Sequence, residues 1–266
     1  MSAQRHWPEY LIEAGCLGLF MVSACVFTVL LEHPSSVVHQ AISNGLVRRM
    51  LMGIAMGGTA VGLIYSPMGR RSGAHMNPSM TLAFYRLGKV QRPDAVFYVV
   101  FQFLGAFLGI VVAWLLLGGR LAERHVNYVA TTPGGYGTGA ALVGEFVISF
   151  LLVSVVLRVS SSPRLERFTG LVAGLMVAAY ITVEAPFSGM SMNPARTFGP
   201  AVFGHVWGAL WVYFLAPPLG MLAAAEVFRR TRPEARHCAK LRHDTSRGCI
   251  FCGEGRYGTF PLSSAL

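Results

Sequence analysis

Long apolar runs separated by short polar segments dominate the chain. The six longest runs cover about 10–31, 50–66, 94–117, 139–159, 168–183 and 205–228. A helix that crosses a bilayer needs roughly 20 mostly apolar residues, so this pattern predicts six transmembrane helices. Two further apolar stretches, 74–87 and 190–203, are too short to span. They are either interfacial loops or a pair of re-entrant half-helices.

The composition favours a membrane protein over other classes. Hydrophobic residues make up 53% of the 266 positions and charged residues 13%, against about 25% charged residues in ordinary globular domains. So few charges leave too little polar surface for a soluble enzyme, and so many apolar residues exclude a disordered chain. Despite the net charge of +10, we expect no nucleic-acid partner.

The basic residues predict the orientation of the spans. If the N-terminus is cytoplasmic, 17 of the 22 Lys and Arg residues fall on the cytoplasmic side. This asymmetry obeys the positive-inside rule and places both termini in the cytoplasm, as an even number of spans requires. We expect an integral protein of the plasma membrane, so the positive charge mostly reflects topology.

An internal repeat divides the apolar part of the chain. The segment from Gly73 to Ser79 is similar to the segment from Gly189 to Ala195, with an offset of 116 residues. A second similarity between the halves is a glutamate early in a span, Glu13 in the first span and Glu145 in the fourth. The halves, about 8–117 and 138–230, each hold three spans. Because three is odd, the second half must be inverted, and inverted repeats place a permeation site at the midplane between the halves.

The repeated motifs, Asn77-Pro78-Ser79 and Asn193-Pro194-Ala195, predict two helix starts. Asn is a favoured N-cap, and Pro is favoured in the first turn of a helix. Half-helices entering from opposite faces would aim two positive helix ends at the bilayer centre, with the asparagine amides free to donate to a passing oxygen. We expect the preceding residues to be extended and their carbonyls to line a track, contributed by Gly73, Ala74, His75, Gly189 and Ser191.

Two such motifs in matching halves of a six-span chain resemble those of the aquaporin and aquaglyceroporin family (major intrinsic proteins). The resemblance covers about residues 8–230. The second motif, from Met192 to Pro200, is similar to the family signature throughout, whereas Ser79 stands where Ala is usual. The resemblance implies an all-α membrane protein with six tilted helices, two half-helices, a pore in each protomer and a homotetramer. It also implies a channel domain over 1–230 that needs neither catalysis nor a cofactor.

The same resemblance assigns a pore constriction. Arg196 would donate to the solute there and repel cations, and spacing from the motifs adds Met56, Ile181 and Met190. The alternative is that Met56 and Ile181 face lipid or the core. This aliphatic rim favours water together with small uncharged solutes, although Thr197, Ala201, Tyr213 and Phe214 are typical of water channels.

Three other functions remain open. One is a facilitator for glycerol or other small neutral solutes. Another is a gradient-coupled secondary transporter, in which Glu13 and Glu145 would carry protons. The resemblance instead favours these carboxylates as buried acceptors for the backbone of the re-entrant loops. The third is a metal-sensing or redox-sensing protein whose tail gates the pore.

The cytoplasmic tail, 231–266, departs from the family core. It carries Cys238, His243, Cys249 and Cys252 in the pattern Cys-x4-His-x5-Cys-x2-Cys. In a reducing compartment, metal binding is favoured over a disulfide, and zinc with three Cys ligands and one His is feasible. The alternative is a solvated tail with incidental thiols.

Overall fold

The computed structural model describes residues 6–232, 238–243 and 249–252. All regular secondary structure in these residues is helical. The long helices are α1 (Trp7–Glu32), α3 (Gly45–Tyr65), α6 (Arg92–Leu117), α7 (Gly137–Ser160), α8 (Thr169–Val183) and α11 (Leu210–Thr231). Two half-length helices are α5 (Pro78–Arg86) and α10 (Pro194–Gly204). The short elements are α2 (Val37–Ala41), α4 (Pro67–Ser72), α9 (Ala185–Ser188), η2 (Gly118–Leu121), η3 (Asn127–Val129) and η4 (Glu166–Phe168).

Six helical segments in the described chain are long and apolar enough to cross a membrane, as the sequence predicts. The fifth reaches 18 residues only because η4 precedes α8. The last begins at Leu210, later than the apolar run suggests, because the first residues of that run form a connection after α10.

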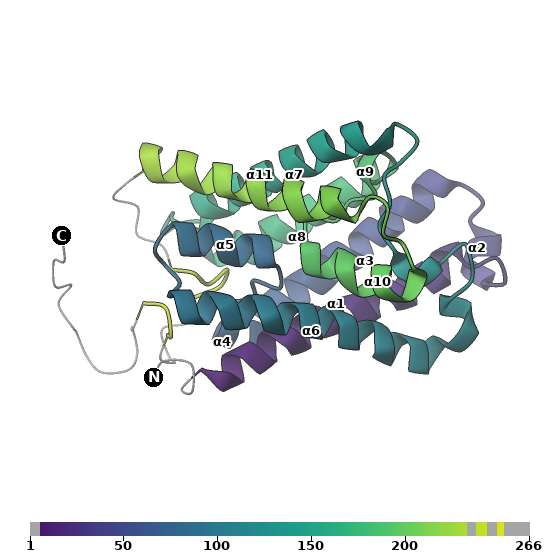
Figure 1. Ribbon diagram of the computed structural model, residues 1–266, viewed down its shortest axis with the longest axis horizontal. Coiled ribbons are helices and arrows are strands. Elements are labelled where there is room, and N and C mark those ends of the chain that lie inside the picture. The colour runs from purple at the N-terminus through teal and green to yellow at the C-terminus, as the bar shows by residue number, and fades with distance from the viewer. Residues whose placement is uncertain (1–5, 233–237, 244–248, 253–266) are drawn as a thin grey trace, which may run out of the picture.

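The long helices run side by side along the longest axis of the molecule (Figure 1). Helix α1 begins and α11 ends at the same end of this bundle, here called the terminus end. Helix α2 lies at the opposite end, here called the loop end. Helix α5 lies toward the terminus end and α10 toward the loop end. The two half-length helices therefore approach the middle of the bundle from opposite ends.

Helix packing follows the inverted repeat. Helix α1 packs against α6 in the first half, and α7 packs against α11 in the second. Helix α5 contacts α11 of the other half, while α10 contacts α6. Helix α3 packs against its counterpart α8 across the centre. Exchanging the two halves reproduces each pairing, as a pseudo-two-fold axis in the membrane plane requires.

The surface and the interior show the polarity of a membrane protein. Ile54 on α3 is 64% exposed, yet the carboxylates of Glu13 and Glu145 are fully buried. Close helix contact is achieved by small residues, as is usual between membrane helices. A Cβ atom at Gly105 on α6 would lie 2.2 Å from the carbonyl oxygen of Ala14 on α1, so only glycine permits this approach.

Candidate functional site

Both half-length helices begin at the predicted asparagines. Asn77 caps α5, and its Oδ1 accepts a hydrogen bond from the Ser79 amide at 2.9 Å. Asn193 caps α10, and its Oδ1 accepts from the amides of Ala195 at 3.1 Å and Arg196 at 3.2 Å. A proline follows each cap, where its missing N–H costs nothing. The two predicted helix starts are thus confirmed.

The two asparagines also join the halves of the molecule. Nδ2 of Asn77 donates to the Met192 carbonyl at 2.7 Å, and Nδ2 of Asn193 donates to the Met76 carbonyl at 2.7 Å. The sequence predicts donation by these amides to a passing oxygen and does not predict these reciprocal bonds. Each amide nitrogen carries two hydrogens, so one N–H per asparagine remains for a further acceptor.

The loop before each asparagine is not simply extended, so that prediction is wrong. Backbone φ angles are positive at three equivalent positions of the two loops, namely Gly73, Ala74 and Met76 in the first and Gly189, Met190 and Met192 in the second. Left-handed residues placed this way turn successive N–H groups toward one side, which forms an anion-binding concavity. A buried carboxylate occupies that side in each half.

Glu13 and Glu145 supply these carboxylates. Glu13 accepts from the backbone amides of His75 at 3.0 Å and Met76 at 2.7 Å. Glu145 accepts from the amides of Ser191 and Met192, both at 2.6 Å. The carboxylates therefore act as buried acceptors for the re-entrant loops, as expected from the sequence.

Each support is completed by residues that no sequence motif singles out. Ser72 and Ser188 donate from Oγ to the same carboxylates at 2.8 and 2.9 Å. The hydroxyl of Tyr98 donates to the Ser72 carbonyl, and that of Tyr213 to the Ser188 carbonyl. The offset of 116 residues also relates Ser72 to Ser188, so a longer alignment of the repeat could have found these two serines.

A glycine is required where each loop turns, which gives a testable prediction. Gly189 has φ +82°, and a Cβ there would lie 2.5 Å from the Thr132 carbonyl oxygen. We expect Gly189→Ala to lower the free energy of unfolding by about 2 kcal/mol or more, because strain and steric overlap add. Thermal unfolding in detergent measures this change. Gly135→Ala is the control, since a Cβ there meets nothing within 4 Å, and equal melting temperatures for both variants would contradict the prediction.

A cavity of about 180 Å³ lies between the two loops. Its wall includes both asparagines and all four residues assigned to the constriction, which are Met56, Ile181, Met190 and Arg196. Met56 and Ile181 thus border this cavity rather than face only lipid. Most of the wall is apolar, and its polar residues are His75, Asn77, Ser191, Asn193 and Arg196.

Most residues of the predicted carbonyl track lie at the cavity wall. Ala74, His75, Gly189 and Ser191 border the cavity. Gly73 does not border it, and its carbonyl instead accepts from the Leu241 amide of the tail at 3.1 Å. The sequence offers no signal for this contact.

Arg196 and Ser79 each hold a buried polar atom that has no partner in the described part of the chain. Nη1 of Arg196 has no hydrogen-bond partner among the described residues, so it can donate to a solute in the cavity. Ser79 is buried, and its Oγ also lacks a partner within the described ranges. Its backbone amide still bonds to Asn77, which shows that serine leaves the asparagine cap intact, as expected.

The tail segments, defined as residues 238–243 and 249–252, lie against the terminus end beside α5 (Figure 1). Nε2 of His75 donates to the Ala239 carbonyl at 2.6 Å, and the Phe251 ring stacks on His75 at 5.7 Å between centroids. Nζ of Lys240 donates to the Arg70 carbonyl at 3.1 Å. Leu241 is part of the cavity wall. The tail therefore covers one end of the cavity.

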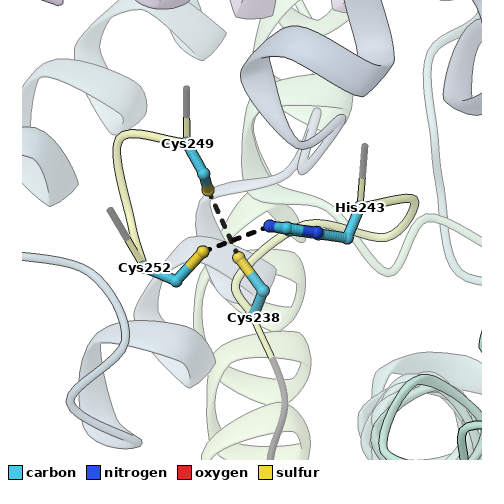
Figure 2. Close-up of side chains that lie close together, drawn as sticks. All are labelled: Cys238, His243, Cys249 and Cys252. Carbon is cyan, nitrogen blue, oxygen red and sulfur yellow. Dashed lines mark hydrogen bonds between the residues drawn. The ribbon is translucent and has the colours of Figure 1, made fainter. Parts of the chain in front are cut away.

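The four predicted tail ligands converge on one point (Figure 2). The ligand atoms of Cys238, His243, Cys249 and Cys252 all lie within 4.8 Å of one another. Sγ of Cys238 lies 3.5 Å from Sγ of Cys249, and this hydrogen bond is the main cause that lowers the pKa of the Cys249 thiol. The sequence spacing thus identified residues that the fold brings together.

Six helices long and apolar enough to cross a membrane, with α1, α3, α7 and α8 lining a cavity at which the two half-helices begin, define a membrane channel. The sequence profile of Major intrinsic protein matches residues 6–228. The chain therefore belongs to the major intrinsic protein family. It is an integral membrane protein and a channel rather than an enzyme, and permeation through such a channel needs no cofactor.

Relatives and solved structures agree with this assignment. The chain is 38% identical over 240 residues to probable aquaporin AqpM of Archaeoglobus fulgidus, covering 86% of this chain and 97% of that one. It is 37% identical over 180 residues to aquaporin NIP1-4 of Oryza sativa subsp. japonica, covering 67% of this chain and 64% of that one. The chain thus spans less than two thirds of the plant relative. The aquaglyceroporin structure from Plasmodium falciparum shares the fold, with a TM-score of 0.73 at 18% identity over 85% of this chain and 97% of that one.

Proposed function

We propose that the chain is a passive channel for water and small uncharged solutes that excludes ions and protons. One observation carries this proposal, namely the largely apolar cavity whose few polar residues include the two asparagine caps and Arg196. An apolar wall holds solutes weakly, which permits rapid passage. The few polar groups replace some of the hydrogen bonds that a solute loses on leaving bulk water.

The ends of the half-helices account for the exclusion of ions. Each helix N-terminus carries roughly +0.5 of an elementary charge, and the bonds of Asn77 and Asn193 hold two such ends together at the cavity. Together with Arg196, they create a positive field that repels cations. The remaining asparagine N–H groups donate to each passing water oxygen. A central water oriented this way cannot relay a proton along a continuous wire.

The proposed filter consists of Met56, Ile181, Met190 and Arg196. Its three aliphatic side chains neither donate nor accept strong hydrogen bonds, and methionine is flexible. Such a rim rejects small neutral solutes less strictly than a rim with an aromatic residue and a histidine. We therefore propose mixed permeability to water and small uncharged solutes. A facilitator specific for glycerol is the alternative within the same class.

A coupled transporter is disfavoured by the buried carboxylates. Both oxygens of Glu13 and both of Glu145 already accept hydrogen bonds from the loops. Their protonation would remove acceptors from buried backbone N–H groups, which is costly. The carboxylates are therefore structural rather than proton carriers.

The domain limits and the setting in the membrane belong to the same proposal. Residues 1–230 form the channel domain, with inverted halves over about 8–117 and 138–230, and residues 231–266 form the tail. The positive-inside asymmetry supports a cytoplasmic terminus end, and we place the protein in the plasma membrane as a homotetramer with one pore per protomer.

Osmotic shrinkage of proteoliposomes tests the proposal. Stopped-flow light scattering is recorded first with an impermeant osmolyte and then with glycerol, for the full chain and for a chain ending at Arg232, since the tail covers one end of the cavity. Shrinkage faster than in empty vesicles is expected for at least the shorter chain. Rates equal to those of empty vesicles for both chains would overturn the proposed channel.

Arg196→Ala tests the arginine separately. We expect glycerol permeability to rise at least about threefold and proton leakage to increase, because the variant removes a side chain and a positive charge from the filter. Proton leakage is measured with an entrapped pH-sensitive dye. Arg120→Ala, which removes an exposed arginine of η2 at the loop end, is the matched control. An unchanged glycerol rate in Arg196→Ala would place the constriction elsewhere.

A further inference from the structure

The tail segments are buried without regular structure of their own. Ala239, Lys240, Leu241 and Cys249 are at most 5% exposed, yet the described tail residues contain neither helix nor strand. So short a piece of chain buries too little apolar surface to fix its own conformation, and proteins usually order such pieces with metals or disulfides. The four converging Cys and His side chains indicate that a metal ion orders the tail segments in this protein.

The spacing of the ligand atoms suits a tetrahedral zinc ion. A Zn–S distance of 2.3 Å places tetrahedral sulfur ligands roughly 3.8 Å apart. Sγ of Cys238 and Sγ of Cys249 are 3.5 Å apart, and Nε2 of His243 lies 3.1 Å from Sγ of Cys252. These two contacts cross in the centre of the cluster (Figure 2). Both contacts lie within about 0.7 Å of that tetrahedral spacing, so small side-chain movements bring the four ligand atoms to a metal site.

The donor set selects the metal. Three sulfur ligands and one imidazole suit zinc, whereas calcium and magnesium require oxygen ligands. No carboxylate belongs to the cluster among the described residues. Four protein ligands also close the coordination shell, which is typical of a structural rather than a catalytic zinc site.

Each tail segment combines two ligands with a contact to the cavity wall, made by Leu241 itself in one segment and through His75 in the other. Segment 238–243 contributes Leu241, whose backbone amide donates a hydrogen bond to the Gly73 carbonyl. Leu241 also borders the cavity. Segment 249–252 contributes Phe251, which stacks on His75 and packs edge-on against Tyr98 at 5.8 Å. A metal that joins the two segments therefore fixes both contacts at once.

We propose that Cys238, His243, Cys249 and Cys252 bind one Zn²⁺, and that the occupied site holds the tail segments across the terminus end of the pore and closes it. Zinc binding displaces the thiol protons to solvent, so three thiolates and a neutral imidazole hold the ion. Loss of the metal releases the tail and opens the pore. This inference rests on the proposed channel function.

Zinc content and water permeability, measured on the same samples of the full chain, test the proposal. The chain is purified under reducing conditions with added Zn²⁺, and metal per chain is determined by mass spectrometry. We expect about one zinc ion per chain, and almost none in the Cys249→Ser/Cys252→Ser double variant. Cobalt substitution should give the intense thiolate-to-metal absorption of a tetrahedral sulfur site in the wild type alone. Less than about 0.2 zinc per chain, with no cobalt signal, would overturn the metal site.

Gating is read from osmotic shrinkage of proteoliposomes. We expect a membrane-permeant zinc chelator to raise the water permeability of the wild type about tenfold, because the metal favours the closed tail conformation. The double variant should be equally permeable with or without the chelator. Cys16→Ala, which removes a buried cysteine of α1, should behave as the wild type. Zinc bound at full stoichiometry with no effect of the chelator would refute the gate.

Two further samples separate the possible failures. Phe251→Ala keeps all four ligands, so it should bind zinc normally but leak water. The chain ending at Arg232 should conduct freely and ignore the chelator. If the shorter chain conducts and the full chain conducts equally with and without zinc, the gate is wrong and the channel stands. If neither the shorter chain nor the chelated full chain conducts faster than empty vesicles, both proposals fail. A rise caused by reductant alone would indicate a disulfide instead of zinc.

Discussion

Replacing Glu145 by alanine should abolish permeation and sharply lower the stability of the protein. Glu145 accepts hydrogen bonds from the amides of Ser191 and Met192 and from the hydroxyl of Ser188. Without the carboxylate, two buried backbone N–H groups lose their acceptor. We expect a loss of about 3–6 kcal/mol in the free energy of unfolding, because each hydrogen bond to a charged group contributes about 1.5–3 kcal/mol. The loop that carries Asn193 would then lose its shape.

Thermal unfolding in detergent and stopped-flow shrinkage measure the two effects of this change. Both are recorded in the chain ending at Arg232, so that the tail does not mask the pore. Glu145→Gln should fall between wild type and alanine, because its carbonyl oxygen can still accept. Glu166→Ala, which removes an exposed carboxylate from η4, is the control. A Glu145→Ala variant with normal melting and normal water flux would refute the role given to the carboxylate.

Narrowing the proposed filter should separate glycerol from water. In the Met56→Phe/Ile181→His double variant, we expect glycerol permeability to fall about tenfold while water permeability stays within about threefold. The phenyl ring fills space that the flexible Met56 side chain leaves to solutes, and the imidazole adds a donor for water. Glycerol is larger than water, so narrowing the filter lowers glycerol permeability more than water permeability.

The control for this variant lies on the same helix. Ile54→Phe adds an equal ring on the outward side of α3, where Ile54 is 64% exposed, and should change neither rate. Both rates are obtained by stopped-flow light scattering in the chain ending at Arg232. A parallel fall of glycerol and water would show that the ring merely blocks the path and that size selection lies at other residues.

The sequence predicted the elements whose cause is local. Apolar length determines the spans, and the pair of Asn and Pro determines where α5 and α10 begin. Glu13 and Glu145 were recognised because ionisable groups inside a membrane need partners. The repeat offset then ordered these features into two inverted halves.

Other features depend on contacts between distant segments and could not be predicted. The amides of Asn77 and Asn193 donate across the halves, which neither motif reveals alone. The loops before them are not extended, because Glu13 and Glu145 draw successive N–H groups to one side. The tail contact with Gly73 joins parts of the chain that share no pattern. Only the Cys and His spacing indicated that the tail is organised.

The reciprocal asparagine bonds have a consequence for biogenesis. The Met76 carbonyl accepts a hydrogen bond from the side-chain amide of Asn193, 117 residues later in the chain. At a translation rate of about 5–20 residues per second, that donor is synthesised roughly 6–23 s after its acceptor. During this interval the first half is already synthesised, and the Met76 carbonyl in its re-entrant loop lacks the Asn193 donor. The nascent protein must therefore tolerate a waiting period, in contact with water, lipid or the insertion machinery, before its two halves can close on each other.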